Sequence, residues 1–402
     1  MNTSFTHSAN LRHLRAALEV DRLGSISGAS RSIHLSQPTL TQGIRELEKG
    51  LGTALFERST SGVITTVPGK AFLRRVARGQ RWLSAIDNLS AASTSRRVDR
   101  KFTTRQLRAL VTVTQEGSYT RAAQRLDLTQ PTLHRAIRDF ESICQLTLFQ
   151  RVPQGVEPSW RAKEITRLAS LFFAELNQGI DELNEACGIL TSSIRIGALP
   201  LSRTELVPAA VIELLKIAPE SQVSIIDGPF EEQLHSLLHG QIDFIIGALR
   251  QPASSKDIEQ ELLFKDPLSI VVRKGHQLTS NTTSSIKELR KLSWIAPRLN
   301  TPAREAFNQM FHREGLESPE SVVECSSLVA TRGLLLNSDR AALLPARQVE
   351  IDVTSGLLAV SPVILKGTDR EIGIMSHKDW QATPLQQTFL KLIRDHTSMR
   401  IR

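Results

Sequence analysis

The spacing of hydrophobic positions changes near residue 192. Before that point apolar residues recur every three or four positions, the spacing of one face of an α-helix, and Gly-Ser pairs and prolines interrupt the series. Beyond it, short runs rich in Val and Ile alternate with helical segments, a pattern typical of a sheet with parallel strands. The pattern predicts a helical first part and an α/β second part.

The helical part contains an internal repeat. Residues 11–62 match residues 104–155 at about 20 of 52 positions without a gap, and the phrase LSQPTL at 35–40 returns as LTQPTL at 128–133. A period of this length is too long for a solenoid repeat, so each copy is expected to be a small domain that arose by duplication.

Each copy has the pattern of a helix-turn-helix. A first helix, expected at 11–22 and 105–116, ends at a Gly-Ser pair and is followed by a short second helix. Ser36 and Thr129 are suited to N-cap a third helix, whose proline falls in the first turn, where its missing N–H breaks no hydrogen bond. The segments 55–69 and 148–162 then predict a hairpin, or wing, in each copy.

The outward face of each third helix carries Gln, Thr and Arg at the helix start, the side chains that contact base edges and phosphates. One Arg in each wing, Arg58 and Arg151, is placed to reach the DNA backbone. An ordinary polar surface is the alternative for a single helix, but two copies in a basic segment favour DNA binding. The predicted DNA-binding residues are Ser36, Gln37, Thr39, Thr41, Gln42, Arg45, Arg58, Thr129, Gln130, Thr132, His134, Arg135, Arg138 and Arg151.

The charge distribution supports a polyanionic partner for the helical part. The net charge is +9, yet residues 192–402 carry 24 basic and 24 acidic side chains, so the basic excess lies before them. Lys and Arg that neutralise phosphates release counterions, which favours nucleic acid binding. A solvated basic surface is the alternative that charge alone leaves open.

A long helix expected at 163–187 joins the two parts and carries a continuous apolar stripe. The stripe could pack on the chain's own core, but it favours helix-on-helix dimerisation, because a helix that connects domains has little else to cover it. The residues of this predicted dimerisation helix are Leu168, Phe172, Leu176, Ile180 and Leu183.

The second part predicts an α/β structure of two subdomains with a ligand cleft near the carboxyl ends of strands. Strands are expected at 194–199, 222–228, 242–248, 268–275, 293–297, 321–326 and 370–376. Helices are expected at 204–217, 230–239, 302–314, 327–337 and 384–397.

Both copies resemble the DNA-binding domain of LysR-type transcriptional regulators. The resemblance lies in the pattern of a small residue, S/T-Q-P, I-R-x-L-E and L-F-x-R. The second part resembles the effector domain of that family in RIGALPLSRTELVPAAV, GQIDFIIGAL, VVRKGHQL and GLLLNSDRAALLP. The resemblance implies a multidomain protein: two all-α winged helix-turn-helix domains, a connecting dimerisation helix and a two-subdomain α/β effector domain with a periplasmic-binding-protein-like fold. The winged domains are expected at 1–69 and 101–162, and they are joined by residues 70–100, a helix at 70–89 followed by a linker. The dimerisation helix is expected at 163–190 and the effector domain at 191–402.

The tandem is a departure, because the family usually has one such DNA-binding domain per chain. The copies also differ from each other: Gln42 stands where the second copy has Arg135, and Leu51-Gly52 where it has Cys144-Gln145. We expect both copies to read DNA, with the alternative that one copy is an assembly module.

The resemblance also implies an effector site. Its residues are expected to follow the first strand and to line both sides of the cleft, with two helix N-termini that offer free N–H groups to a carboxylate or hydroxyl. Helix capping is the alternative for each Ser and Thr. The residues implied are Leu199, Pro200, Ser202, Arg203, Arg298, Asn300, Thr301, Arg304, Ser326 and Ser327. A sugar or an aromatic or organic acid is the expected effector.

Other classes of function are disfavoured. The sequence has no catalytic motif, no metal-ligand spacing and three scattered cysteines, so no enzyme, metal or cofactor is expected. Its beginning lacks the pattern of a signal peptide, which argues against a solute-binding protein and for a cytoplasmic one without a membrane partner. The expected partners are double-stranded promoter DNA, a small-molecule effector, RNA polymerase and further copies of the chain, as a homodimer or homotetramer.

Overall fold

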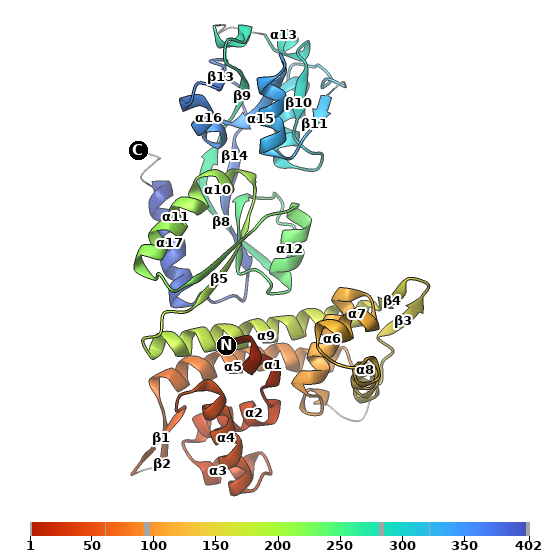
Figure 1. Ribbon diagram of the computed structural model, residues 1–402, viewed down its shortest axis with the longest axis vertical. Helices are drawn as coiled ribbons and strands as arrows, with labels where there is room; N and C mark the ends of the chain where they lie inside the picture. The colour runs from red at the N-terminus through yellow and green to blue at the C-terminus, as the bar shows by residue number, and fades with distance from the viewer. Residues whose placement is uncertain (1, 61, 92–96, 281–284, 321, 399–402) are drawn as a thin grey trace.

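The computed structural model describes residues 2–60, 62–91, 97–280, 285–320 and 322–398. Two small helical units lie at the ends of a pair of long helices, α5 and α9, and two α/β lobes are stacked on the opposite side of that pair (Figure 1). None of the helices in these ranges combines the length and the apolar character that crossing a bilayer requires.

The first winged unit consists of three helices and a hairpin. Its elements are α2 (Leu11–Leu23), α3 (Ile26–Ser32), α4 (Gln37–Leu51), β1 (Phe56–Ser59) and β2 (Gly62–Thr65). Ser36 caps α4 by accepting a hydrogen bond from the Thr39 amide, and the proline lies in the first turn as predicted. A short helix that the sequence did not predict, α1 (Asn2–Ser8), precedes the unit and packs on α9.

The second winged unit repeats these elements. It contains α6 (Thr104–Glu116), α7 (Tyr119–Arg125), α8 (Gln130–Cys144), β3 (Phe149–Val152) and β4 (Gly155–Pro158). The same contacts recur: the carboxylates of Glu48 and Glu141 accept hydrogen bonds from the amides of Leu55 and Leu148 at 2.8 and 2.7 Å. The predicted winged helix-turn-helix fold is therefore present twice.

A glycine fixes each wing against the turn after the first helix. Gly62 and Gly155 have φ angles of +140° and +144°, and a Cβ at either would lie 2.6 or 2.2 Å from the carbonyl oxygen of Gly24 or Gly117. A side chain would separate the wing from the helical core, so glycine is required at both positions.

Helices α5 (Val67–Ala85) and α9 (Trp160–Ala186) pack along one another in antiparallel directions (Figure 1). A Cβ placed on Gly179 would lie 3.2 Å from the Phe72 ring, and one on Gly79 would lie 2.9 Å from the Phe172 ring. The two glycines thus allow the helices to approach closely, each beneath an aromatic ring of the other helix.

This pairing corrects the prediction for the apolar stripe of α9, which was expected to be free for a second chain. Helix-on-helix packing does occur, but α5 of the same chain covers the stripe. One hydrophobic core includes residues of both winged units, residues of α5 and all five stripe residues, namely Leu168, Phe172, Leu176, Ile180 and Leu183. The sequence argument failed because it treated residues 70–89 as part of a connection and gave that helix no partner.

Arg75 lies inside the α5–α9 pair with none of its side chain exposed. Its guanidinium donates to Glu182 Oε1 from Nε and Nη2 at 3.0 and 2.7 Å, and to Glu175 Oε2 and Gln178 Oε1 from Nη1 at 3.1 and 2.8 Å. A further bond of 2.7 Å from Nη2 reaches the carbonyl of Gln381 in the α/β part. These five bonds match the five N–H donors of an arginine.

Lobe I follows α9 and contains a five-stranded sheet in the order β6-β5-β7-β14-β8. Strands β5, β6 and β7 are parallel, and β14 runs antiparallel to both β7 and β8. The strands are β5 (Ser193–Ala198), β6 (Gln222–Ile226), β7 (Phe244–Ala248), β8 (Ile258–Asp266) and β14 (Arg370–His377), and the helices are α10 (Pro200–Thr204), α11 (Leu206–Ile217), α12 (Phe230–Leu238) and α17 (Pro384–Ser398).

Lobe II has a second five-stranded sheet in the order β11-β10-β12-β9-β13. The chain passes between the lobes twice, from β8 to β9 and from β13 to β14. The strands are β9 (Leu268–Arg273), β10 (Trp294–Ala296), β11 (Val322–Glu324), β12 (Ala341–Pro345) and β13 (Leu358–Val360), and the helices are α13 (Ile286–Arg290), α14 (Pro302–His312), α15 (Leu328–Leu336) and α16 (Glu350–Thr354).

The predicted two-subdomain α/β fold is confirmed, with differences in detail. Strands β8, β12 and β13 were not predicted, and β8 has only two buried residues besides its terminal Asp266, so its apolar pattern is weak. Residues 92–96 of the expected linker and residue 321 of an expected strand lie outside the described ranges.

Replacing Arg75 tests how much the buried pairing stabilises the chain. In Arg75→Met, Glu175 and Glu182 lose their buried partner, which is expected to cost about 3–5 kcal/mol of unfolding free energy. Arg74→Met is the matched control, because Arg74 also pairs with Glu182 but its side chain is 60% exposed, so its removal should cost about 1 kcal/mol or less. Urea denaturation followed by circular dichroism measures both. Equal effects of the two substitutions would contradict this account.

Candidate DNA-reading surface and effector cleft

The first reading face is the outward side of α4 with the adjoining wing. Gln37, Thr39, Gln42, Arg45 and, in the wing, Arg58 are exposed, while Thr41 is half-buried. The apolar residues of the same helix, such as Leu40 and Ile44, point into the unit. Gln42 donates to Glu46 Oε1 at 3.1 Å, so its amide is held along the helix surface.

The second reading face has the same design on α8. Gln130, Arg135, Arg138 and the wing residue Arg151 are exposed, and Thr132 and His134 are half-buried. The His134 ring lies against Tyr119, with ring centroids 5.0 Å apart, which orients the imidazole. The caps Ser36 and Thr129 use their hydroxyl groups on their own helix starts.

The arginines of both faces have no carboxylate partner among the residues that the structure describes. Arg45, Arg135, Arg138 and the wing arginines form none of the ion pairs found in this part of the chain. Arginines beside the faces do pair, as Arg22 does with Glu19 at 2.6 Å and Arg125 with Glu116 at 2.7 Å. These guanidinium groups are therefore not held in ion pairs within the described part of the chain and are available to an anion.

The implied effector residues of lobe II come together at the carboxyl ends of β10 and β11. Arg304 donates to the Pro297 carbonyl at 3.0 Å and lies 3.6 Å from Glu324. Thr301 and Ser327 cap α14 and α15, the structural role that was the alternative for each of them. The remaining implied residues here, Arg298, Asn300 and Ser326, lie on the surrounding loops.

The implied residues of lobe I follow β5. Leu199 and Ser202 are buried, and the Ser202 hydroxyl bonds to the carbonyls of Leu199 and Ile246 at 2.9 and 2.7 Å. Pro200 is exposed, and Arg203 pairs with Asp227 at 2.6 Å. Leu199 and Ser202 thus serve the packing of lobe I.

Sequence reasoning missed Arg250, which follows β7 in lobe I. Its guanidinium lies 4.2 Å from the centroid of the Phe230 ring and donates to the Ala248 carbonyl at 3.3 Å. Burial lowers the pKa of Arg250, and the carboxylates that act on it are Glu231 of lobe I and Glu305 of lobe II. This arginine therefore lies where the two lobes face each other. No spacing in the sequence could have identified it, because its neighbours come from separate elements.

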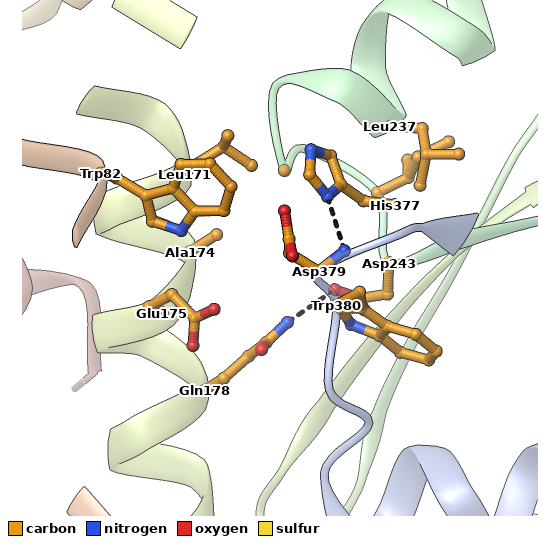
Figure 2. A pocket seen from close by; sticks show the side chains of 12 residues that line it. Trp82, Leu171, Ala174, Glu175, Gln178, Leu237, Asp243, His377, Asp379 and Trp380 are labelled. Carbon is orange, nitrogen blue, oxygen red and sulfur yellow. Dashed lines mark hydrogen bonds between the residues drawn. The ribbon is translucent and has the colours of Figure 1, made fainter. Parts of the chain in front are cut away.

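The junction between the helix pair and lobe I is also built from distant segments. Figure 2 shows Trp82 of α5 and Glu175 and Gln178 of α9 on one side of a pocket, with His377 and Asp379 on the other. The Trp82 and His377 rings meet edge to face at 5.5 Å, and Gln178 donates to Asp243 Oδ1 at 3.4 Å. Burial lowers the pKa of His377.

The comparisons with known proteins agree with this architecture. A family model for the bacterial regulatory helix-turn-helix protein of the lysR family matches twice, at residues 11–70 and 104–163, and the LysR substrate-binding domain matches residues 189–398. The chain is a member of the LysR family of transcriptional regulators.

Known LysR-type regulators match this one over different lengths. The regulator GalR of Pseudomonas putida is 30% identical over 385 residues, which is 96% of each chain, so that match includes both winged units. PcaQ of Agrobacterium fabrum is 26% identical over 74% of this chain and 96% of its own. The family consists of regulators and not of enzymes.

Solved structures of the family share the fold. A full-length OxyR variant from Pseudomonas aeruginosa has a TM-score of 0.56 at 24% identity and covers 72% of this chain and 96% of its own. CbnR, a LysR family regulator, has a TM-score of 0.53 at 19% identity and covers 73% of this chain and 98% of its own. About a quarter of this regulator thus lies outside each match.

Asp181 stands where α9 leads into lobe I of this LysR-type regulator. Its Oδ2 accepts hydrogen bonds from the Ser193 amide at 3.3 Å and the Ser193 hydroxyl at 3.1 Å. Burial raises the pKa of Asp181 to about 6, since these bonds only partly offset the removal of water and the carboxylates of Asp243 and Glu185 act in the same direction as burial. The ionised form therefore weakens the fold at neutral pH.

The substitution Asp181→Asn tests this conclusion. When the pKa of a carboxyl rises on folding, the free energy of unfolding falls as the pH increases above the pKa of the unfolded state, which is near 4. The loss is complete above about pH 6. The variant should therefore be more stable than the parent by about 2–3 kcal/mol at pH 8 and equal to it at pH 4. Urea denaturation at both pH values measures the difference. The control is Asp139→Asn at an exposed position; a gain at pH 4 as large as at pH 8 would contradict the prediction.

Proposed function

We propose that this protein regulates transcription by binding promoter DNA with both winged units and by sensing an organic acid in the cleft between its lobes. The observation that carries DNA binding by both units is that the third helix of each presents exposed Gln and Arg side chains, with the arginines outside any ion pair of the described residues and Thr side chains beside them. The set begins with Gln37 and Gln130 and includes Arg45 and Arg138. These side chains suit base edges and phosphates.

The alternative is that one winged unit reads DNA and the other only assembles the protein. Both units bury the same apolar face and expose the same polar face, with no described element covering α4 or α8 on the outward side. An assembly module would be expected to lack the unpaired arginines of that face, since nothing would neutralise them. The presence of Arg45 and Arg138 therefore supports reading by both.

An acidic effector is supported by the charge of the cleft. Arg250 projects from lobe I between the lobes, and Arg298 and Arg304 border the start of α14 in lobe II. The N-termini of α14 and α15 also lie here, and the positive end of a helix dipole favours an anion. Glu324 lies beside Arg304, and Glu231 and Glu305 act on Arg250. Arg298 forms none of the ion pairs found among the described residues, so an aromatic or aliphatic carboxylate fits this cleft better than a neutral sugar.

The helix pair supplies a route from the cleft to the reading faces. Arg75 and Arg78 of α5 donate to the carbonyls of Gln381 and Asp379, which follow β14. Strand β14 itself begins at the crossing between the lobes, where Arg370 pairs with Asp266 at 2.7 Å. Closure of the lobes on an effector would move β14 and change how the winged units of a homodimer or homotetramer are spaced on DNA, and hence the recruitment of RNA polymerase.

DNA binding by each unit is tested with Arg45→Ala and Arg138→Ala on a duplex selected from random DNA by the full chain. Each substitution should reduce the magnitude of the slope of log K against log salt concentration by about 0.9 for each phosphate that the variant no longer neutralises. Arg394→Ala is the control: it removes the same charge in α17, where Arg394 pairs with Glu261, and should leave the slope unchanged. An effect from only one of the two substitutions would favour the assembly-module alternative, and no effect from either would contradict reading by both helices.

The nature of the effector is tested by thermal unfolding of the full chain with a panel of carboxylic acids and of neutral sugars. An acid that binds should raise the stability by about 2.7 kcal/mol at a concentration 100 times its Kd, and Arg250→Met should remove that shift. Arg273→Met, which removes a half-buried arginine paired with the exposed Asp339, is the control and should keep that shift. Stabilisation by a sugar that survives Arg250→Met would overturn the proposal of an acid.

A further inference from the structure

The α5–α9 pair has an approximate twofold arrangement. The two regions matched by the family model begin at residues 11 and 104, and at that offset Gly79 and Phe172 are equivalent positions. These two residues meet each other in the pair. At the same offset Phe72 corresponds to Ile165 and Gly179 to Ile86, and both isoleucines are fully buried in the core that contains Phe72. The two winged units are thus related as two subunits of a dimer would be.

Charge makes this a pairing of unlike helices. Helix α5 carries five basic residues and no acidic one, and the second half of α9, residues 174–186, carries four acidic residues and no basic one. Arg75 and Arg78 contact Glu175, and Arg74 and Arg75 contact Glu182. Two α5 helices would bring arginines together, and two α9 helices would bring carboxylates together, at the cost of burying like charges. The pairing of α5 with α9 is therefore the favoured one.

The helix pair fixes the two reading units as parts of one body. One continuous core contains Leu47 and Leu55 of the first unit and Leu133 and Leu148 of the second, together with the helices between them. Figure 1 shows the units at opposite ends of the α5–α9 pair. Helix-turn-helix units related by a twofold axis bind half-sites in inverted orientation, about one helical turn apart or a multiple of it.

The two reading faces are not identical. Gln37, Thr39 and Arg45 have the same residue types at the equivalent positions of α8, whereas Thr41 and Gln42 correspond to His134 and Arg135. The differing side chains are also held differently, since Gln42 bonds to Glu46 and the His134 ring packs at a tilt against Tyr119. Gln suits adenine and Arg suits guanine, so the two faces prefer different bases at that position.

We infer that the two winged units of one chain form a complete and asymmetric pair of DNA-reading heads. The operator of the protein therefore consists of two unlike half-sites in inverted orientation, both bound by the same chain. The inference rests on the proposed reading of DNA by both winged units. Under this inference, the sequence difference between the two copies determines the orientation in which the protein binds its operator.

The asymmetry is tested by selecting duplexes from random DNA with the full chain and with a face-exchange variant. The parent should select two unlike half-sites. The double substitution Thr41→His with Gln42→Arg, which gives α4 the face of α8, should select a symmetric site and lower the affinity for the parent's site roughly tenfold. The reciprocal variant, His134→Thr with Arg135→Gln, is the matched control and should select the other symmetric site. A palindrome selected by the parent, or a lone half-site, overturns the inference.

Mixing two variants tests whether the two heads that bind one operator belong to the same chain. Chains with Arg45→Ala and chains with Arg138→Ala are unfolded together, refolded and assayed on the parent's site. Each variant alone should bind about tenfold more weakly than the parent, and the mixture should bind no better than either variant, because every chain has one defective head. Mixed oligomers that recover parental affinity would show that heads from different chains share a site, and would overturn the inference.

The outcomes separate this inference from the proposed function. If each single variant weakens binding and the mixture restores it, both helices read DNA but the heads come from different chains. If neither variant weakens binding, direct reading fails and the asymmetric pair fails with it. Circular dichroism of each variant establishes that it is folded, since all four exchanged positions lie on the surface or are half-buried.

Discussion

The buried guanidinium of Arg75 is the group on which the arrangement of the molecule depends. It joins α5 to α9 through Glu182, Glu175 and Gln178 and joins both helices to the α/β lobes through the Gln381 carbonyl. A buried charge is tolerated only where every donor finds an acceptor in good geometry. This requirement sets the register of the two helices, and with it the positions of the winged units at their ends.

The same guanidinium relates the sensing part to the reading part. Effector closure can alter DNA binding only if it favours one arrangement of the winged units over another. The residues after β14 touch α5 through backbone carbonyls, and β14 runs from the crossing between the lobes to this point. A movement of the lobes therefore reaches the helix pair without passing through a flexible linker.

The local design of the chain could be predicted from its sequence, because it follows short-range rules. The caps at Ser36 and Thr129 and the prolines in the first helical turn lie as expected, and so do the inward-facing residues of α4 and α8. Most strands of the lobes were also recognised by their apolar runs. The duplicated sequence motifs contributed most to the fold prediction, since they identified two similar units in one chain.

The partner of the α9 stripe could not be predicted in the same way. Periodicity shows that a helix has an apolar face but not which helix covers it, and α5 is separated from α9 by an entire winged unit. Arg75 gave no signal either, since it is one of five basic residues on α5 and reads as part of a solvated face. Strand β8 was missed because its burial pattern is irregular, and Arg250 because its surroundings come from both lobes.

Amide hydrogen exchange of the full chain, with and without a duplex selected by that chain, tests the central claim most directly. The account predicts that the first turns of α4 and α8 both become protected at saturating DNA, while the amides of α5 and α9 exchange slowly in either state. Protection of one recognition helix with no change in the other would contradict the claim that the two winged units read DNA as one body.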